Sequence, residues 1–172
     1  NIKNYSCSYD TVYFGGGTPI LLYEHIADIL ASAHITDGAE ITVEANPCMG
    51  EPHILDALRS AGVTRISFGV QSMNEKELRF LGRRHTVTQA EAALTNAKAA
   101  GFESISADMM IGLPGQDEDI ITDTASRLAA LGVHHISAYI LKIEQGTPFA
   151  AQSIDMPDDD RTAELYLQIG RA

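Results

Sequence analysis

The chain has 172 residues, of which 45% are hydrophobic and 20% charged, with 14 glycines and 6 prolines. This length fits one domain, and the composition excludes a disordered, collagen-like or coiled-coil protein. The 12 basic and 23 acidic residues give a net charge of −11, which repels nucleic acid and anionic membranes. No apolar run is long enough for a transmembrane segment and no signal peptide opens the chain, so we expect a cytoplasmic protein.

The chain is predicted to begin with alternating strands and helices. A strand over about Thr11 to Phe14 is followed by a helix over about Pro19 to Ala33, which Thr18 caps and Pro19 opens. A strand over about Glu40 to Ala45 and a helix over about Pro52 to Ala61 come next. Strands that alternate with helices of about 10 to 15 residues indicate a parallel βα array.

A six-residue pattern that begins with glycine and ends in Ile-Ser then recurs three times, at Gly62–Ser67, Gly101–Ser106 and Gly132–Ser137. Each glycine fits the position just past a helix, where the backbone turns left-handed at little cost. Each Ile-Ser pair is expected to open a strand.

The remaining helices follow from start and stop signals. A short helix is predicted from Asn74, and a longer one covers about Thr88 to Ala100, with Thr88 and Glu91 as its capping box. Two more are expected over about Asp117 to Leu131 and about Asp158 to Ala172. Because the series starts with a strand and the last helix has no stop signal, we expect a fragment of a longer protein.

The predicted strands alternate between apolar and polar side chains, although parallel strands covered on both faces are apolar almost throughout. The face opposite the apolar side chains carries small or polar residues: Thr11, Tyr13, Gly15, Thr42, Glu44, Ser67, Gly69, Gln71, Ser106, Asp108, Ser137 and Tyr139. An open parallel barrel with helices outside and a wet interior explains this pattern, because carboxylates are costly to bury without partners. A doubly wound sheet with exposed polar strand ends is the alternative. In both folds a ligand would lie at the carboxyl ends of the strands.

Several side chains at those ends are candidates for binding a ligand. Gly15, Gly16 and Gly17 join a strand to a helix and allow close approach of a ligand to the backbone, although a plain tight turn explains them equally well. The polar residues Glu44, Gln71 and Asp108 share one strand face and suit ribose hydroxyls or a cationic amine. Capping of a loop and structural hydrogen bonding are the alternative roles for these three residues.

Arg83 and Arg84 belong to the one basic patch of this acidic chain, which also contains Lys76 and Arg79. An arginine there could clamp a carboxylate with two parallel hydrogen bonds, whereas a solvated helix end explains Arg84 better. The two cysteines, Cys7 and Cys48, are too few and too far apart for a disulfide framework or a zinc motif. No metal ligands are therefore assigned in this chain.

Five segments considered together carry a resemblance to a known family: YFGGGTP, ITVEANP, RISFGVQSMNEKELRFLGRRHT, ADMMIGLPGQ and ISAYILKIEQGTPF. They resemble the oxygen-independent coproporphyrinogen III oxidase-like family of radical S-adenosylmethionine proteins, over nearly the whole chain. Within that family they are most similar to the haem chaperone branch. The resemblance implies an α/β fold, a partial (β/α)6 open barrel of TIM-barrel type that lacks its first βα unit. Residues 1–172 would then be part of the radical S-adenosylmethionine core domain, without the C-terminal domain.

The resemblance also implies site residues and cofactors. Seven residues would bind S-adenosylmethionine: Gly16, Gly17 and Thr18 at the methionyl amine, Arg83 at its carboxylate, and Glu44, Gln71 and Asp108 around the ribose. The family binds a 4Fe-4S cluster through a CxxxCxxC motif, which this sequence lacks, so the cluster ligands are expected outside this chain. Ile20 stands where the family commonly has serine or threonine.

The implied function is that of a haem chaperone, with haem or porphyrin as ligand and a haem-acceptor protein as a possible partner. A coproporphyrinogen III dehydrogenase, which decarboxylates propionates by radical chemistry, is the first alternative. An ordinary barrel lyase or isomerase would need a lysine or histidine base in the lumen, and the polar strand faces contain neither. A non-catalytic haem-binding module is the remaining possibility.

Overall fold

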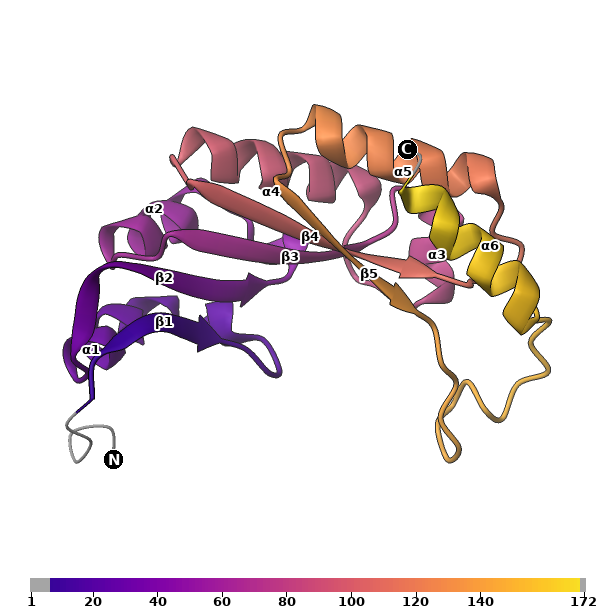
Figure 1. Ribbon diagram of the computed structural model, residues 1–172, viewed down its shortest axis with the longest axis horizontal. Coiled ribbons are helices and arrows are strands. Elements are labelled where there is room, and N and C mark those ends of the chain that lie inside the picture. Colours follow the sequence, from indigo (N-terminus) through magenta and orange to yellow (C-terminus); the bar gives the residue numbers. More distant parts are fainter. Residues whose placement is uncertain (1–6, 171–172) are drawn as a thin grey trace.

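The computed structural model describes residues 7–170. Within them one sheet contains five strands in the order of the chain: β1 (Tyr9–Phe14), β2 (Ile35–Ala45), β3 (Arg65–Gln71), β4 (Ser104–Ile111) and β5 (His135–Ile140). Every neighbouring pair is parallel. Figure 1 shows the sheet curling, with α1, α2, α4 and α5 on one side and the other face open. The predicted α/β fold, a partial open barrel of parallel strands with helices outside, is confirmed, and the described strands form half of such a barrel.

The helical elements occupy the connections between strands. They are η2 (Pro19–His25), α1 (Ile26–Ala31), η3 (Pro47–Met49), α2 (Pro52–Ser60), α3 (Glu75–Phe80), α4 (Val87–Ala99), α5 (Glu118–Ala130) and α6 (Asp159–Ile169). The extra short helix predicted from Asn74 is α3, and the Asn74 side chain caps it by accepting from the Lys76 N–H. Of the helix predicted to end at Ala172, residues 171 and 172 lie outside the described part.

The helix predicted over Pro19 to Ala33 was wrong in kind and in length. Residues 19–25 form a 3-10 helix, Leu22 has non-helical angles (φ −100°, ψ 19°), and the α-helix begins only at Ile26. Thr18 does not cap it, because its hydroxyl donates to the neighbouring Gly17 carbonyl at 2.6 Å. The second strand also begins earlier than predicted, at Ile35 in place of Glu40.

The capping box of α4 lies two residues before the predicted one. Thr86, not Thr88, accepts from the N–H of Gln89 at 3.2 Å, and the Gln89 side chain accepts from the Thr86 N–H at 2.9 Å. Thr86-Val-Thr-Gln89 and Thr88-Gln-Ala-Glu91 both satisfy the spacing of a capping box. The helix starts at the first because Val87 is buried and its N–H donates to Glu75 across the preceding turn.

The three repeated glycines end α2, α4 and α5 as predicted. Gly62, Gly101 and Gly132 have φ of 96°, 78° and 86°. In each case the next residue donates its N–H back into the last helical turn: Val63 to Leu58, Phe102 to Ala97 and Val133 to Leu128. This Schellman arrangement satisfies carbonyls that the helix end leaves free and turns the chain toward the next strand.

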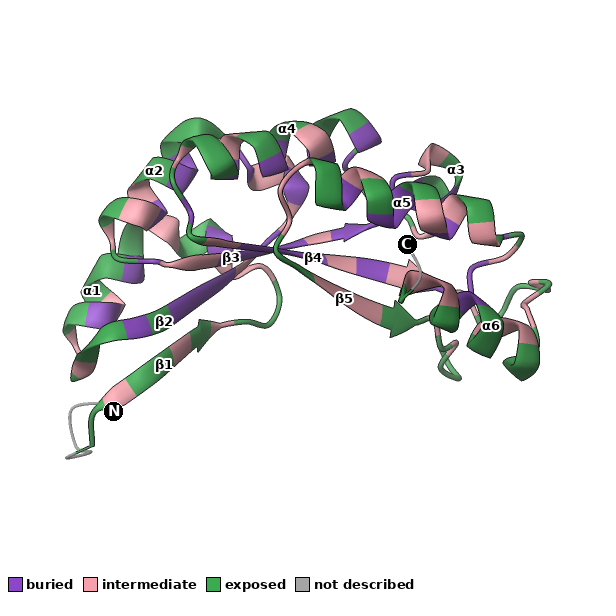
Figure 2. Ribbon diagram, turned by 45° about the horizontal axis from the view of Figure 1, so that its top comes forward, coloured by how far each residue is buried: buried purple, intermediate pink, exposed green. Residues whose placement is uncertain are grey.

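The core lies between the sheet and the helices. The apolar set of each strand faces this layer, so that Val43, Ile66, Phe68 and Ala107 are fully buried together with Leu55 and Leu94 from α2 and α4 and other side chains. A smaller cluster of Met109, Ile111, Ile121 and Leu165 lies where α5 and α6 cover β4. Ile140, which ends the edge strand β5, is apolar but 52% exposed. Figure 2 shows burial concentrated in the central strands.

Across residues 7–170, no helix has both the length and the apolar character that crossing a membrane requires.

We predict that Gly50→Ala destabilises the fold. Gly50 follows η3 and lies against α4, where a Cβ would overlap the Cβ of Ala93 and stand 2.7 Å from its Cα. The Gly50 carbonyl also accepts from Asn96 Nδ2 at 2.9 Å, which holds the two segments together. Overpacking of this kind lowers the free energy of unfolding by about 1 to 3 kcal/mol. Urea unfolding measures this difference. Gly170→Ala is the control, because its Cβ would meet nothing closer than the Leu167 carbonyl at 3.7 Å. Equal stability of Gly50→Ala and the wild type would contradict this packing.

Candidate functional site

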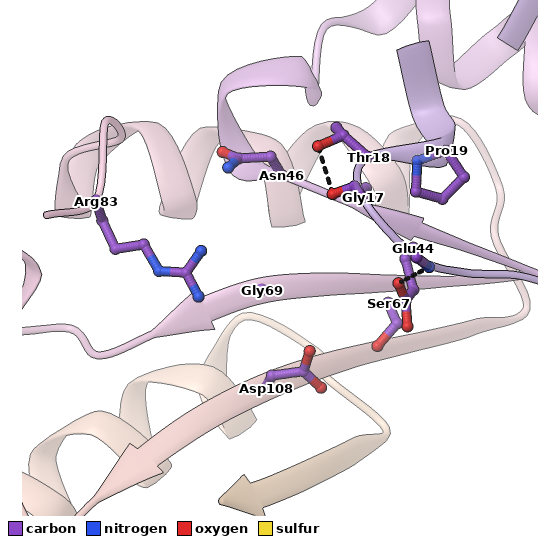
Figure 3. A pocket seen from close by; sticks show the side chains of 11 residues that line it. Gly17, Thr18, Pro19, Glu44, Asn46, Ser67, Gly69, Arg83 and Asp108 are labelled. Atoms are coloured by element: carbon purple, nitrogen blue, oxygen red, sulfur yellow. Dashed lines mark hydrogen bonds between the residues drawn. The ribbon is translucent and has the colours of Figure 1, made fainter. Parts of the chain in front are cut away.

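A polar pocket lies on the open face of the sheet, near the carboxyl ends of the strands. Its volume is about 210 Å³. It is lined by the loop after β1, the ends of β2 and β3, one residue of β4 and one arginine from the segment after α3: Gly16, Gly17, Thr18, Pro19, Glu44, Ala45, Asn46, Ser67, Gly69, Arg83 and Asp108. Figure 3 shows these side chains converging from elements that are far apart in the sequence.

Glu44 fixes the glycine loop on one side of the pocket. Its Oε2 accepts from the Gly16 N–H at 3.1 Å, and its Oε1 accepts from the Tyr13 hydroxyl at 2.7 Å. The hydrogen bond to Glu44, with partial burial, raises the pKa of Tyr13 to about 12. Tyr13 therefore stays protonated and keeps donating. This pair of bonds sets where the glycine loop stands over the strand ends.

Asp108 and Arg83 lie on the other side of the pocket. Asp108 projects from β4, and the Arg83 guanidinium extends from the segment after α3 over Gly69 toward it (Figure 3). Burial and then the charge of Glu44 raise the pKa of Asp108, while a hydrogen bond with Ser137 and the charge of Arg83 oppose the rise. The pocket thus holds two carboxylates and one guanidinium, which suits a ligand with hydroxyls, an amine and a carboxylate.

The structure brings six of the seven residues expected from the sequence into this pocket: Gly16, Gly17, Thr18, Glu44, Arg83 and Asp108. Gln71 does not line it. It is 6% exposed, and its Nε2 lies 3.1 Å from where a Cβ would stand on Gly69, so its side chain folds against that residue. The Gln71 backbone has φ +72°, and the register between β3 and β4 shifts between Phe68 and Gln71. Arg84 is exposed and does not line the pocket.

Four residues take part in the site without having been assigned a role. Ser67 and Gly69 belong to the polar strand face, so alternation alone was a signal for them. Tyr13 shares that face, and its hydrogen bond to Glu44 depends on a register between β1 and β2 that the sequence does not show. Asn46 lines the pocket and also caps η3 through its Oδ1, which accepts from the Cys48 N–H at 3.0 Å.

Within residues 7–170, no group of three or more His, Cys, Asp and Glu side chains is placed to hold a metal ion. Cys7 is exposed and Cys48 half-buried, both as free thiols. His134 lies at the opposite ends of the strands from the glycine loop, where its Nδ1 accepts from the Ile105 N–H at 3.2 Å. This histidine therefore has a structural role, in holding the start of β4.

The sequence profile of the radical SAM superfamily matches residues 2–128. The chain belongs to this superfamily. It is 38% identical over 165 residues to the heme chaperone HemW of Mycobacterium tuberculosis, covering 91% of this chain and 42% of that protein. It is 37% identical over 172 residues to the mitochondrial radical S-adenosyl methionine domain-containing protein 1 of Bos taurus, covering 95% and 39%.

Among solved structures, the coproporphyrinogen III oxidase HemN of Escherichia coli, a radical SAM enzyme, superimposes with a TM-score of 0.80 at 26% identity, over 94% of this chain and 39% of that one. The chain thus spans about two fifths of the length of these relatives. The resemblance to the coproporphyrinogen oxidase-like family, on its haem chaperone side, is confirmed. Membership of the radical SAM superfamily implies S-adenosylmethionine and a 4Fe-4S cluster as cofactors, and it decides against an ordinary barrel lyase or isomerase.

We predict that Asp108→Asn stabilises the protein at pH 7. The pKa of Asp108 is raised in the folded state above its ordinary value of 3.8. Its contribution to stability is therefore complete below pH 3.8 and is lost as the pH rises through the raised pKa. Asparagine imitates the protonated form, so the variant should melt a few degrees higher at pH 7, with no advantage below pH 3.8.

Asp56→Asn on the exposed side of α2 is the control for this experiment. It should leave the melting temperature unchanged both at pH 7 and below pH 3.8. A lower melting temperature for Asp108→Asn than for the wild type at pH 7 would show that Arg83 and Ser137 outweigh the burial of the Asp108 carboxylate.

Proposed function

We propose that this chain is the S-adenosylmethionine-binding core of a haem chaperone of the HemW type. The observation that carries the proposal is the pocket on the open face, which gathers the glycine loop, Glu44, Asp108 and Arg83 around one space. Each of these groups matches one part of a methionyl nucleoside: an amine, a carboxylate or the ribose hydroxyls. The relatives named HemW support the chaperone half of the proposal.

The residues present fit S-adenosylmethionine. A Cβ on Gly16 or Gly17 would have nothing within 4 Å, so the loop leaves room for a ligand against its backbone. The Gly17 carbonyl accepts one bond, from Thr18, and has a second lone pair for the methionyl amine. Arg83 would bind the methionyl carboxylate with its planar guanidinium. Glu44 and Asp108 would accept from the ribose hydroxyls, with Glu44 already oriented by Tyr13 and Gly16.

The cluster that the family uses does not fit the residues of this chain. A 4Fe-4S cluster takes about four ligands, usually thiolates, and the chain has two cysteines, Cys7 and Cys48. We therefore assign the cluster ligands to a part of the protein outside residues 1–172, which form part of its radical SAM core domain. Reductive cleavage of bound S-adenosylmethionine supplies hydrogen-abstraction chemistry in this family. The residues described in this chain bind and orient the molecule.

We predict that Arg83→Ala and Asp108→Ala each weaken the binding of S-adenosylhomocysteine to the full-length protein, as measured by calorimetric titration. Each removes a charged partner from a partly buried pocket, at a cost of about 1.5 to 3 kcal/mol, or roughly 10-fold to 150-fold in affinity. Arg84→Ala, one residue away and outside the pocket, is the matched control and should bind like the wild type.

Unchanged affinity in both Arg83→Ala and Asp108→Ala would overturn the pocket assignment. If Arg84→Ala lost as much affinity as Arg83→Ala, the carboxylate would have to be assigned to the other arginine.

The chaperone proposal has a definite alternative in the decarboxylating enzyme, because the HemN structure matches the same half-barrel. We expect the full-length protein, with its cluster reconstituted, to retain about one haem and to leave coproporphyrinogen III unchanged when given S-adenosylmethionine and a reductant. Haem is followed by its absorbance after gel filtration, and decarboxylation by chromatography of the porphyrins. Turnover to protoporphyrinogen IX would replace the chaperone by the dehydrogenase. A haem-acceptor protein in the cytoplasm would be the expected partner of the chaperone.

A further inference from the structure

The chain makes an unusual turn where β3 ends beside the pocket. Gln71 has φ +72° and is the one non-glycine residue with positive φ among residues 7–170. The Ser72 N–H donates to the Val70 carbonyl at 2.9 Å, which closes a three-residue γ-turn around Gln71. A γ-turn with the central φ near +75° is rare and strained. Such strain persists only where surrounding structure holds it, and it gathers at functional sites.

His85 supplies that hold. Its Nε2 lies 3.0 Å from the same Val70 carbonyl, which therefore receives two donors. Because a carbonyl only accepts, Nε2 must carry the proton, and Nδ1 of the neutral ring is then the unprotonated nitrogen. His85 is 2% exposed, and within the described chain Nδ1 has no hydrogen-bond partner. Burial lowers the pKa of His85, so the ring stays neutral and its one N–H is used on Val70.

The donor itself is held rigidly. His85 immediately precedes Thr86, whose capping box begins α4, and the Val87 N–H donates to Glu75 Oε1 at 2.8 Å. On the other side, the Arg83 N–H donates to the Leu78 carbonyl at 2.9 Å at the end of α3. The segment between α3 and α4 is thus fixed at both ends. His85 joins its middle to the end of β3.

The turn determines where the Gln71 amide lies. The Gln71 side chain is buried, its Oε1 has no partner among residues 7–170, and its Nε2 stands against Gly69, which lines the pocket. A regular β conformation at Gln71 would place this side chain differently. A buried amide oxygen without a hydrogen-bond partner is uncommon in folded proteins. A ligand bound in the adjacent pocket would supply the missing donor.

We propose that His85 is a positioning residue of the pocket, which holds the Val70 carbonyl and thereby keeps the strained turn that places the unpartnered Gln71 amide beside Gly69 of the pocket lining, where it would meet a bound ligand. This inference rests on the proposed binding of S-adenosylmethionine. It adds that a buried histidine which touches no ligand sets the affinity through Gln71. Arg83, although two residues from His85, acts independently.

The test is a calorimetric titration of S-adenosylhomocysteine into the full-length protein carrying variants of His85. His85→Leu fills the same space without a donor and should weaken binding about tenfold, the size expected for a coupled polar contact. In a Gln71→Ala background the same change should cost threefold or less, because the amide it positions is gone. In an Arg83→Ala background it should keep its full effect.

Two amide variants keep the proposal testable if His85→Leu does not fold. His85→Gln can reach the Val70 carbonyl with its N–H, whereas the side chain of His85→Asn is one methylene shorter. Binding close to wild type for the first and weak for the second is expected, and equal binding by both would overturn the proposal. His134→Leu removes a comparable histidine bond to backbone at the far ends of the strands and should leave affinity unchanged.

The outcomes separate this inference from the proposed function. Wild-type binding that is lost in Arg83→Ala but not in His85→Leu would support the pocket and refute the role of His85. If His85→Leu weakens binding equally with and without Gln71→Ala, His85 acts through packing and not through the Gln71 amide. Failure of the wild type to bind would overturn both.

Discussion

Glu44 and Asp108 project from the open face of a parallel sheet, and the rest of the architecture depends on how these two carboxylates are accommodated. A parallel sheet is normally covered on both faces, but a packed layer over this one would leave two charges unpaired at a cost of several kcal/mol each. The helices therefore cover one face only (Figure 1). The other face remains a pocket, in which Tyr13 and the Gly16 N–H hold Glu44 while Arg83 approaches Asp108.

The sequence shows this constraint because strand side chains alternate with a period of two. Once Ile41, Val43 and Ala45 are assigned to the helix side, Thr42 and Glu44 must face the other way, and the same argument places Ser67 and Asp108. The repeated glycines were equally informative, because a glycine that follows a helical stretch commonly ends the helix in a left-handed conformation. The fold class and the orientation of Glu44 and Asp108 toward the open face follow from these two local rules, whereas the assignment of the seven site residues to S-adenosylmethionine came from the resemblance to the family.

The failures have physical causes that local patterns in the sequence do not show. Thr86 and Thr88 offer the same capping pattern, and burial of Val87 against the rest of the fold decides between them. The 3-10 segment before α1 forms where Thr18 has spent its hydroxyl on Gly17, so the expected cap is missing. Gln71 lies at a shift in register between β3 and β4, next to a carbonyl that contacts His85 fourteen residues later in the chain, and no local pattern in the sequence shows either feature. Tertiary contacts decide the outcome at Thr86 and at Gln71, whereas at Thr18 a local hydrogen bond to the neighbouring residue competes with the helix cap.

The strained turn of the site and the carboxylate Asp108 belong to strands in the buried middle of the sheet. β3 and β4 lie in the middle of the sheet and are mostly buried, whereas β1 and β5 at its edges are largely exposed (Figure 2). Local opening is easier where fewer apolar groups are buried. Ser67 and Gly69 therefore form a stiff floor of the pocket, and the glycine loop after β1 forms a rim that the Glu44 carboxylate holds. A ligand entering such a pocket would meet a floor that is already formed, and adjustment of fit would fall to the glycine loop.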